Sequence, residues 1–192
     1  MDLLDSREIR QAFITSYLDK VEAARSKASE VLQKRTASKE ATQAGTNAEK
    51  ALIASLREVQ KAAKQKYGRA NRIALADYLV GKNLNGNKPN LAQTSQTLVD
   101  KLAEDKLPGF TTAKVKAVGT GRTTWMSAQA TQVSAQSAAE DSGTEFKALL
   151  KTITDEKLAI QLAADAEWPH ENRDHSGVRK EFALPANRPA KV

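Results

Sequence analysis

The sequence predicts an all-α fold: an elongated antiparallel bundle of about five helices, two of them long, with an extended C-terminal tail. Alanine supplies 32 of the 192 residues, and it has the lowest entropic cost of any residue in a helix. Apolar residues recur at steps of three and four along most of the chain, which is the period of a helix packed on one side. Segments rich in Gly, Pro and Asn interrupt this pattern and divide the helices.

The first helix is expected to begin at Asp5–Glu8, because this segment has the spacing of a capping box. Apolar residues follow at helical spacing, namely Ile9, Phe13, Tyr17, Val21, Ala24, Ala28 and Val31. Gly45 precedes a second capping box, Thr46–Glu49. We therefore expect the first helix to end near Ala44, with a break or bend at Gly45.

The second helix, residues 47–67, is predicted by its two contrasting faces. Leu52, Leu56 and Val59 share one face with Ala63, and basic residues occupy the opposite one. The pair Tyr67–Gly68 indicates its end. A short third helix is expected over residues 70–80.

Asn, Gly and Pro predict a loop over residues 81–90, and Asn90 is a candidate cap for a fourth helix. Its inward residues are expected to be Leu91, Leu98, Val99 and Leu102. The segment Leu107–Phe110 ends it, because it contains Pro and Gly.

The chain is expected to be helical again from Thr112, with an interruption at Gly119–Gly121 and then a long helix over residues 122–167. The apolar seam of this helix recurs near every 3.5 residues, as in a coiled coil. The seam is Trp125, Ala128, Gln132, Ala135, Ala139, Phe146, Leu149, Ile153 and Ile160. Gly143 separates its small first half from its bulky second half, so a local bend is expected there.

After Trp168–Pro169 the composition changes to Pro, Asn, Arg and His, which predicts a helical bundle over residues 1–168 and an extended tail over 169–192. Trp168, Phe182 and Leu184 are more apolar than a solvated tail requires. We expect them to dock, either on the bundle of the same chain or on a neighbouring molecule.

Few side chains in this sequence suit catalysis or metal binding. There is no cysteine, which excludes disulfides, thiolate metal ligands and a cysteine nucleophile. The only histidines, His170 and His175, are five residues apart and would not share one helix face. The sequence therefore predicts no enzyme, no catalytic residue, no metal site and no cofactor.

The compartment is predicted from what the sequence lacks. The first residues, Met1–Asp5, have neither the basic nor the apolar region of a secretory signal. The longest strongly apolar stretch, Ile73–Val80, is far shorter than the ~20 residues of a membrane span. A cytoplasmic protein that makes no membrane contact is expected.

The net charge of +7 is unevenly distributed. Residues 41–72 hold seven Lys and Arg against two Asp and Glu, whereas residues 125–168 hold three against seven. The candidate polyanion-binding residues are Lys50, Arg57, Lys61, Lys64, Arg69 and Arg72. A basic helix face is typical of phosphate binding, but it is also compatible with a solvated face or with pairing to the acidic last helix of the same or another copy.

Long helices, Ala-rich seams and the shortage of catalytic side chains together favour a non-enzymatic role. We expect a structural or protein–protein interaction protein that self-associates as a homo-oligomer. The alternative is a polyanion-binding protein, with nucleic acid as the partner of the basic helix face.

Overall fold

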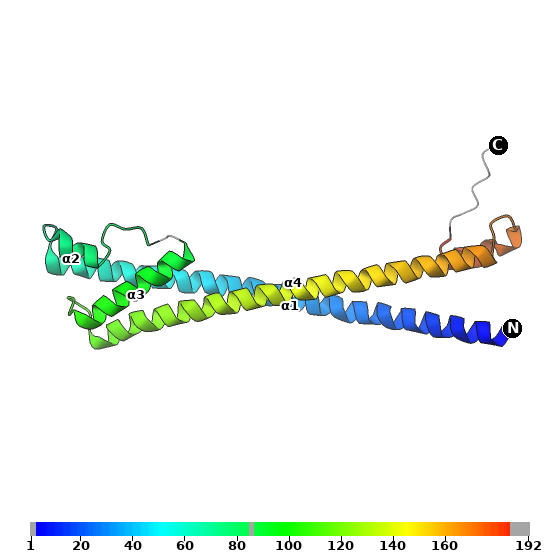
Figure 1. The fold of residues 1–192 in the computed structure, drawn as a ribbon, viewed down its shortest axis with the longest axis horizontal. Coiled ribbons are helices and arrows are strands. Elements are labelled where there is room, and N and C mark those ends of the chain that lie inside the picture. Colours follow the sequence, from blue (N-terminus) through cyan, green and yellow to red (C-terminus); the bar gives the residue numbers. More distant parts are fainter. Residues whose placement is uncertain (1–2, 85–86, 185–192) are drawn as a thin grey trace, which may run out of the picture. The chain divides into compact units, whose positions relative to one another are not determined.

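The computed structural model of the protein describes residues 3–84 and 87–184, with side chains from Ala12 onward except that of Arg173. This part of the chain is helical and contains no strand (Figure 1). The helices are α1 (Leu3–Tyr67), α2 (Arg72–Asp77), α3 (Lys88–Glu104), α4 (Thr112–Glu167) and α5 (Ser176–Glu181), with one 3-10 turn at Arg173–His175. The predicted all-α class with two long helices is confirmed.

Helix α1 is continuous, so the predicted break at Gly45 is wrong. Gly45 is buried, and a Cβ placed there would lie 3.0 Å from Oε1 of Gln132 and 3.3 Å from Nε2 of Gln129. The glycine therefore permits close approach of α1 to α4 and does not end a helix. One interior glycine costs a helix only about 1 kcal/mol, which packing along a long seam exceeds.

Helix α4 is likewise continuous from Thr112, and the predicted interruption at Gly119–Gly121 is wrong. It also continues through Gly143. Near the start of α4, a Cβ on Gly119 would reach Cγ1 of Val99 at 3.9 Å, which is ordinary van der Waals contact. Glycine in these positions is tolerated inside the helix, because the helix is stabilised by tertiary packing as well as by local propensity.

The chain forms two compact units, each containing part of α1 and part of α4. The central unit is residues 34–139, and the terminal unit combines residues 1–33 with 140–192.

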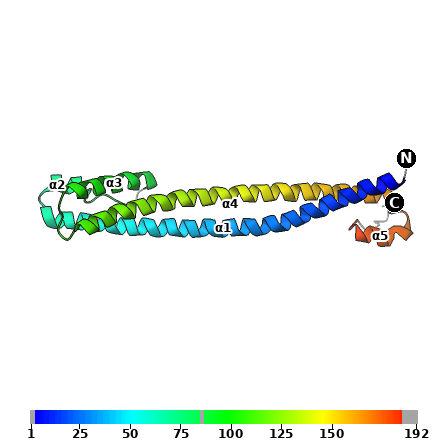
Figure 2. The same cartoon turned by 90° about the horizontal axis from the view of Figure 1, so that it is seen from below.

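The central unit holds most of the buried apolar residues. Leu52, Leu56 and Val59 of α1 are at most 1 % exposed, and α3 lies alongside the long helices (Figure 2). The cluster also includes Tyr78, Leu91, Leu98, Leu102, Val118 and Trp125. In the central unit, the predicted inward residues of α1 (Leu52, Leu56, Val59 and Ala63) are buried, and those of α3 are buried except for the half-buried Val99. In the terminal unit the predicted apolar face of α1 is only partly buried, because Phe13 is 40 % exposed.

Two connections in the central unit differ from prediction. The cap of α3 is Asn87 and not Asn90: its Oδ1 accepts a hydrogen bond from the backbone N–H of Asn90 at 2.9 Å. With this cap, Pro89 lies in the first turn, where no intrahelical N–H is needed. Helix α2 is also shorter than predicted, because Leu79 adopts a positive φ of 52° just after it.

The terminal unit has a thin core. Lys20 bonds Glu156, and Nζ of Lys27 lies 2.5 Å from a carboxylate oxygen of Glu145, so α1 and α4 run antiparallel here. Of the 17 buried apolar residues in the described chain, 14 lie in the central unit. The terminal unit contributes only Ala24, Val31 and Ala164. Its bulkier seam residues, Phe146, Leu149, Ile153 and Ile160, are half-buried.

The segment after Trp168 is not extended throughout, which corrects the predicted tail. It turns through the 3-10 segment into α5. Arg179 of α5 is only 6 % exposed, because its guanidinium bonds Asp165 at 2.6 Å and the backbone carbonyl of Trp168. This long-range pairing holds α5 against the end of α4. Residues 185–192 of the predicted tail lie outside the described residues.

Candidate interaction surfaces

The predicted basic residues on α1 share one exposed face. Lys50, Arg57, Lys61 and Lys64 are separated by seven, four and three residues, which are close to whole turns of a helix. They point away from the buried face that carries Leu52. Arg69 lies in the turn after α1, and Arg72 is the first residue of α2. All six are exposed, and four of them share a helix face.

Two further basic residues, Arg35 and Lys39, extend this face and were missed in the sequence. Both are exposed, and Lys39 precedes Lys50 by 11 residues, or about three turns. The predicted break at Gly45 had separated them from the rest, whereas the unbroken helix aligns all six. We call Arg35, Lys39, Lys50, Arg57, Lys61 and Lys64 the basic stripe.

Acidic side chains of α1 lie to the sides of the basic stripe. Glu40, Glu49 and Glu58 each follow or precede a stripe residue directly. Adjacent helical residues are rotated by about 100°, so each glutamate projects from a different face. At the same rotation per residue, the stripe residues themselves fall within an arc of about 80°.

The two units differ strongly in charge. The sequence of the central unit holds 17 Lys and Arg against 7 Asp and Glu. The terminal unit holds 13 against 16. The positive charge of the protein is therefore concentrated in the unit that carries the basic stripe.

The terminal unit exposes large apolar side chains on both long helices. On α1, Ile14, Leu18 and Leu32 are 39 %, 58 % and 64 % exposed, and they lie near one angular position because their spacings are about one and four turns. On α4, Leu158 and Leu162 are 55 % and 63 % exposed and one turn apart. We call these five residues the apolar stripes. Apolar residues aligned in this way are typical of an interaction surface, whereas isolated ones are not.

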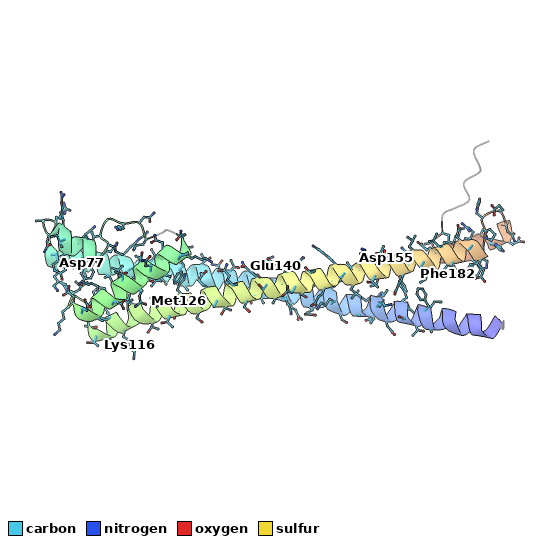
Figure 3. The ribbon with its side chains drawn as sticks, viewed as in Figure 1. Asp77, Lys116, Met126, Glu140, Asp155 and Phe182 are labelled. Atoms are coloured by element: carbon cyan, nitrogen blue, oxygen red, sulfur yellow. The ribbon has the colours of Figure 1, made fainter. Side chains whose placement is uncertain are left out.

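Two of the predicted tail residues, Trp168 and Phe182, contact each other at the end of α4. The rings of Trp168 and Phe182 stack with their centroids 5.2 Å apart, and Phe182 lies beside this end of α4 (Figure 3). Leu184 is half-buried, and its backbone N–H bonds the carbonyl of Arg179 at 3.0 Å. Trp168 and Phe182 also line an apolar pocket of about 300 Å³ that reaches Phe13.

Asp105 joins three elements of the central unit. It accepts hydrogen bonds from Nζ of Lys66 and from the hydroxyls of Tyr67 and Tyr78, the last at 2.8 Å. The bonds from Lys66 and Tyr67 lower the pKa of Asp105 from 3.8 to about 2. Burial, with the bond to Asp105, raises the pKa of Tyr78 above its ordinary value. This cluster fastens the end of α1 to α2 and to the end of α3, and it was not predicted from the sequence.

The two histidines lie near polar side chains but do not form part of a metal-binding cluster in the described chain. Within residues 3–84 and 87–184, no group of three His, Cys, Asp or Glu side chains could hold a metal ion. Nε2 of His175 lies 3.2 Å from the side-chain amide of Asn172, and His170 lies beside Glu171. No described helix combines the length and the apolar character needed to cross a membrane.

Comparison with known proteins adds no relative: no protein-family model, curated protein or solved structure matches this chain.

Proposed function

We propose that this protein is a non-enzymatic helical interaction protein that self-associates through its terminal unit. The observation that carries the proposal is the combination of exposed apolar stripes with a core of three small or medium apolar residues in the same unit. A two-helix unit with so little buried apolar area gains much of its stability by packing against another molecule.

The area in the stripes is large enough to matter. Each of the five side chains exposes roughly half of its surface to water. Burying this exposed half would contribute about 1 kcal/mol per residue. Two copies would gain roughly 10 kcal/mol, against an association cost estimated at about 4–15 kcal/mol. We therefore expect a reversible dimer whose population depends on concentration.

A second copy suits this surface better than a strongly charged partner does. The terminal unit has 13 basic and 16 acidic residues, so two such units repel each other little. Stripes on two antiparallel helices can also meet their own counterparts about a two-fold axis, giving a four-helix arrangement. The central unit, with its large excess of positive charge, would repel its copy.

Sedimentation equilibrium over a roughly hundred-fold concentration range tests the proposal. The parent is expected to approach twice its chain mass of 20.9 kDa. The double variant Leu18→Glu, Leu162→Glu is expected to stay at the monomer mass, because it buries a carboxylate in each stripe. The matched control Ile73→Glu, Val133→Glu changes two exposed apolar residues of the central unit, 82 % and 61 % exposed, and is expected to behave as the parent.

A parent that stays monomeric over the whole range would overturn the proposal. Equal loss of mass in the stripe variant and the control would also count against it, because the effect would then not be specific to the terminal unit. Far-UV circular dichroism of each variant shows that the helices are retained.

A further inference from the structure

The basic stripe has the dimensions of a nucleic-acid contact. From Arg35 to Lys64 it extends about 44 Å along α1, at 1.5 Å per residue. One turn of B-form DNA is about 34–36 Å, so the stripe spans slightly more than one turn of a duplex. All six of its side chains are exposed.

Other basic residues of the chain contact acidic side chains between helices. In the terminal unit, Lys20 and Lys27 bond Glu156 and Glu145 across α1 and α4. In the central unit, Lys66 bonds Asp105 between α1 and the end of α3. The stripe residues lie on the exposed side of α1, pointing away from Leu52, Leu56 and Val59 of its core. The excess of 17 basic over 7 acidic residues in the central unit strengthens their positive potential.

The acidic residues of a second copy do not form a matching surface. Glu140, Asp155 and Asp165 of α4 are exposed, but the exposed residues Lys147 and Lys151 interrupt them. A nucleic-acid strand offers a phosphate about every 3.4 Å without interruption by positive charge. A row of cations with no acidic residue on the same face fits this regular row of anions better.

We infer that the basic stripe on α1 binds the phosphate backbone of duplex nucleic acid without sequence preference. Lysine and arginine contacts to phosphates position a protein on a duplex but carry no sequence information. Arg69 and Arg72, both exposed, follow the end of α1 in the chain and so lie near one end of the stripe.

The test is fluorescence anisotropy with a labelled mixed-sequence DNA duplex of about 20 base pairs, longer than the stripe. Six phosphate contacts predict a slope of about −5 in log affinity against log salt concentration. Between about 50 and 200 mM salt, the affinity of the parent is expected to fall on the order of a thousand-fold. A second duplex of unrelated sequence is expected to bind equally.

The decisive variant is Lys50→Glu, Lys61→Glu, Lys64→Glu, and its matched control is Lys147→Glu, Lys151→Glu, Lys157→Glu on α4. Both change the net charge equally, and all six residues are exposed. The stripe variant is expected to lose about three units of the salt slope and most of its affinity at low salt, whereas the control keeps the slope of the parent. If circular dichroism shows that the Glu variant does not fold, the same three residues changed to Gln provide the comparison.

Two outcomes would overturn the inference. The first is a parent that does not bind DNA at about 50 mM salt. If the stripe variant then also has a lower mass than the parent in sedimentation, the stripe is assigned to contact with a second copy. The second is equal weakening of the two variants, which would assign binding to net charge and not to the stripe.

Discussion

Replacing Gly45 by alanine sets helix propensity against helix packing, and the structure gives the size of each effect. Alanine in a helix interior is about 0.8–1.0 kcal/mol more favourable than glycine. The new Cβ would, however, lie 3.0 Å from Oε1 of Gln132 and 3.3 Å from Nε2 of Gln129. Both contacts are amide groups at the ends of side chains, whose terminal torsions are broad, so displacing them costs roughly 1 kcal/mol in total. We expect Gly45→Ala to be nearly neutral.

Gly121 provides the matched control, because it lies inside α4 of the same unit and a Cβ there would meet nothing within 4 Å. Gly121→Ala is therefore expected to stabilise the central unit by the whole propensity difference between glycine and alanine, about 0.8–1.0 kcal/mol. Valine separates the two sites further. At Gly45 it is expected to destabilise by about 1–3 kcal/mol through overpacking, whereas at Gly121 it stays near neutral.

Urea unfolding, followed by tryptophan fluorescence, measures these differences. The protein has one tryptophan in each unit, so a Trp168→Phe background leaves Trp125, which is 2 % exposed, as the reporter of the central unit. The free energies of unfolding of the four variants are then compared at equal slopes. If Gly45→Ala stabilises as much as Gly121→Ala, the close approach at Gly45 does not explain the unbroken α1.

Two further predictions concern single side chains. The folded-state pKa of Asp105 is about 2, below its ordinary value of 3.8. The bonds of Asp105 therefore stabilise the central unit at pH values above 3.8, and this contribution is lost as the pH falls towards 2. Asp105→Asn is expected to lower the urea midpoint at neutral pH and to lack this acid-dependent loss; a parallel decline of parent and variant would contradict it. Arg179→Ala is expected to detach α5, exposing Trp168 to solvent and shifting its emission to longer wavelength, whereas Lys180→Ala, at an exposed neighbour, leaves emission unchanged. Arg179→Ala is expected to lower the free energy of unfolding by less than the roughly 3–5 kcal/mol of breaking a fully buried ion pair, because its partner Asp165 is half exposed.

Local pattern was sufficient to predict the buried face of α1 in the central unit and the end of α1. Leu52, Leu56 and Val59 are spaced for one helix face, and Gly68, with a φ of +68°, follows the last residue of α1. These features are determined by residues within about two helical turns, so they can be predicted from the local sequence.

The errors arose where a distant residue decides the conformation. A glycine before a capping box has the same local sequence whether it ends a helix or lets another helix pack closely against it. At Gly45 the closely packed residues are Gln129 and Gln132, more than 80 positions away in the sequence. Arg179 was similarly predicted to lie in an extended tail, because the sequence around it does not reveal its partner Asp165, which belongs to α4. The basic stripe was only partly identified because it depends on the continuity of α1.

The shared helices have a consequence for how the protein opens. Because α1 continues from one unit into the other, melting of the thin-cored terminal unit shortens an existing helix and requires no new nucleus when it reforms. Opening can therefore begin at Ala24 and Val31 while Leu52 and Leu56 remain packed. Backbone amides of α1 would accordingly be protected from solvent exchange in a gradient, strongest in the central unit and weakest towards the first turns. Such a graded helix can change conformation at one end while its other end keeps its structure.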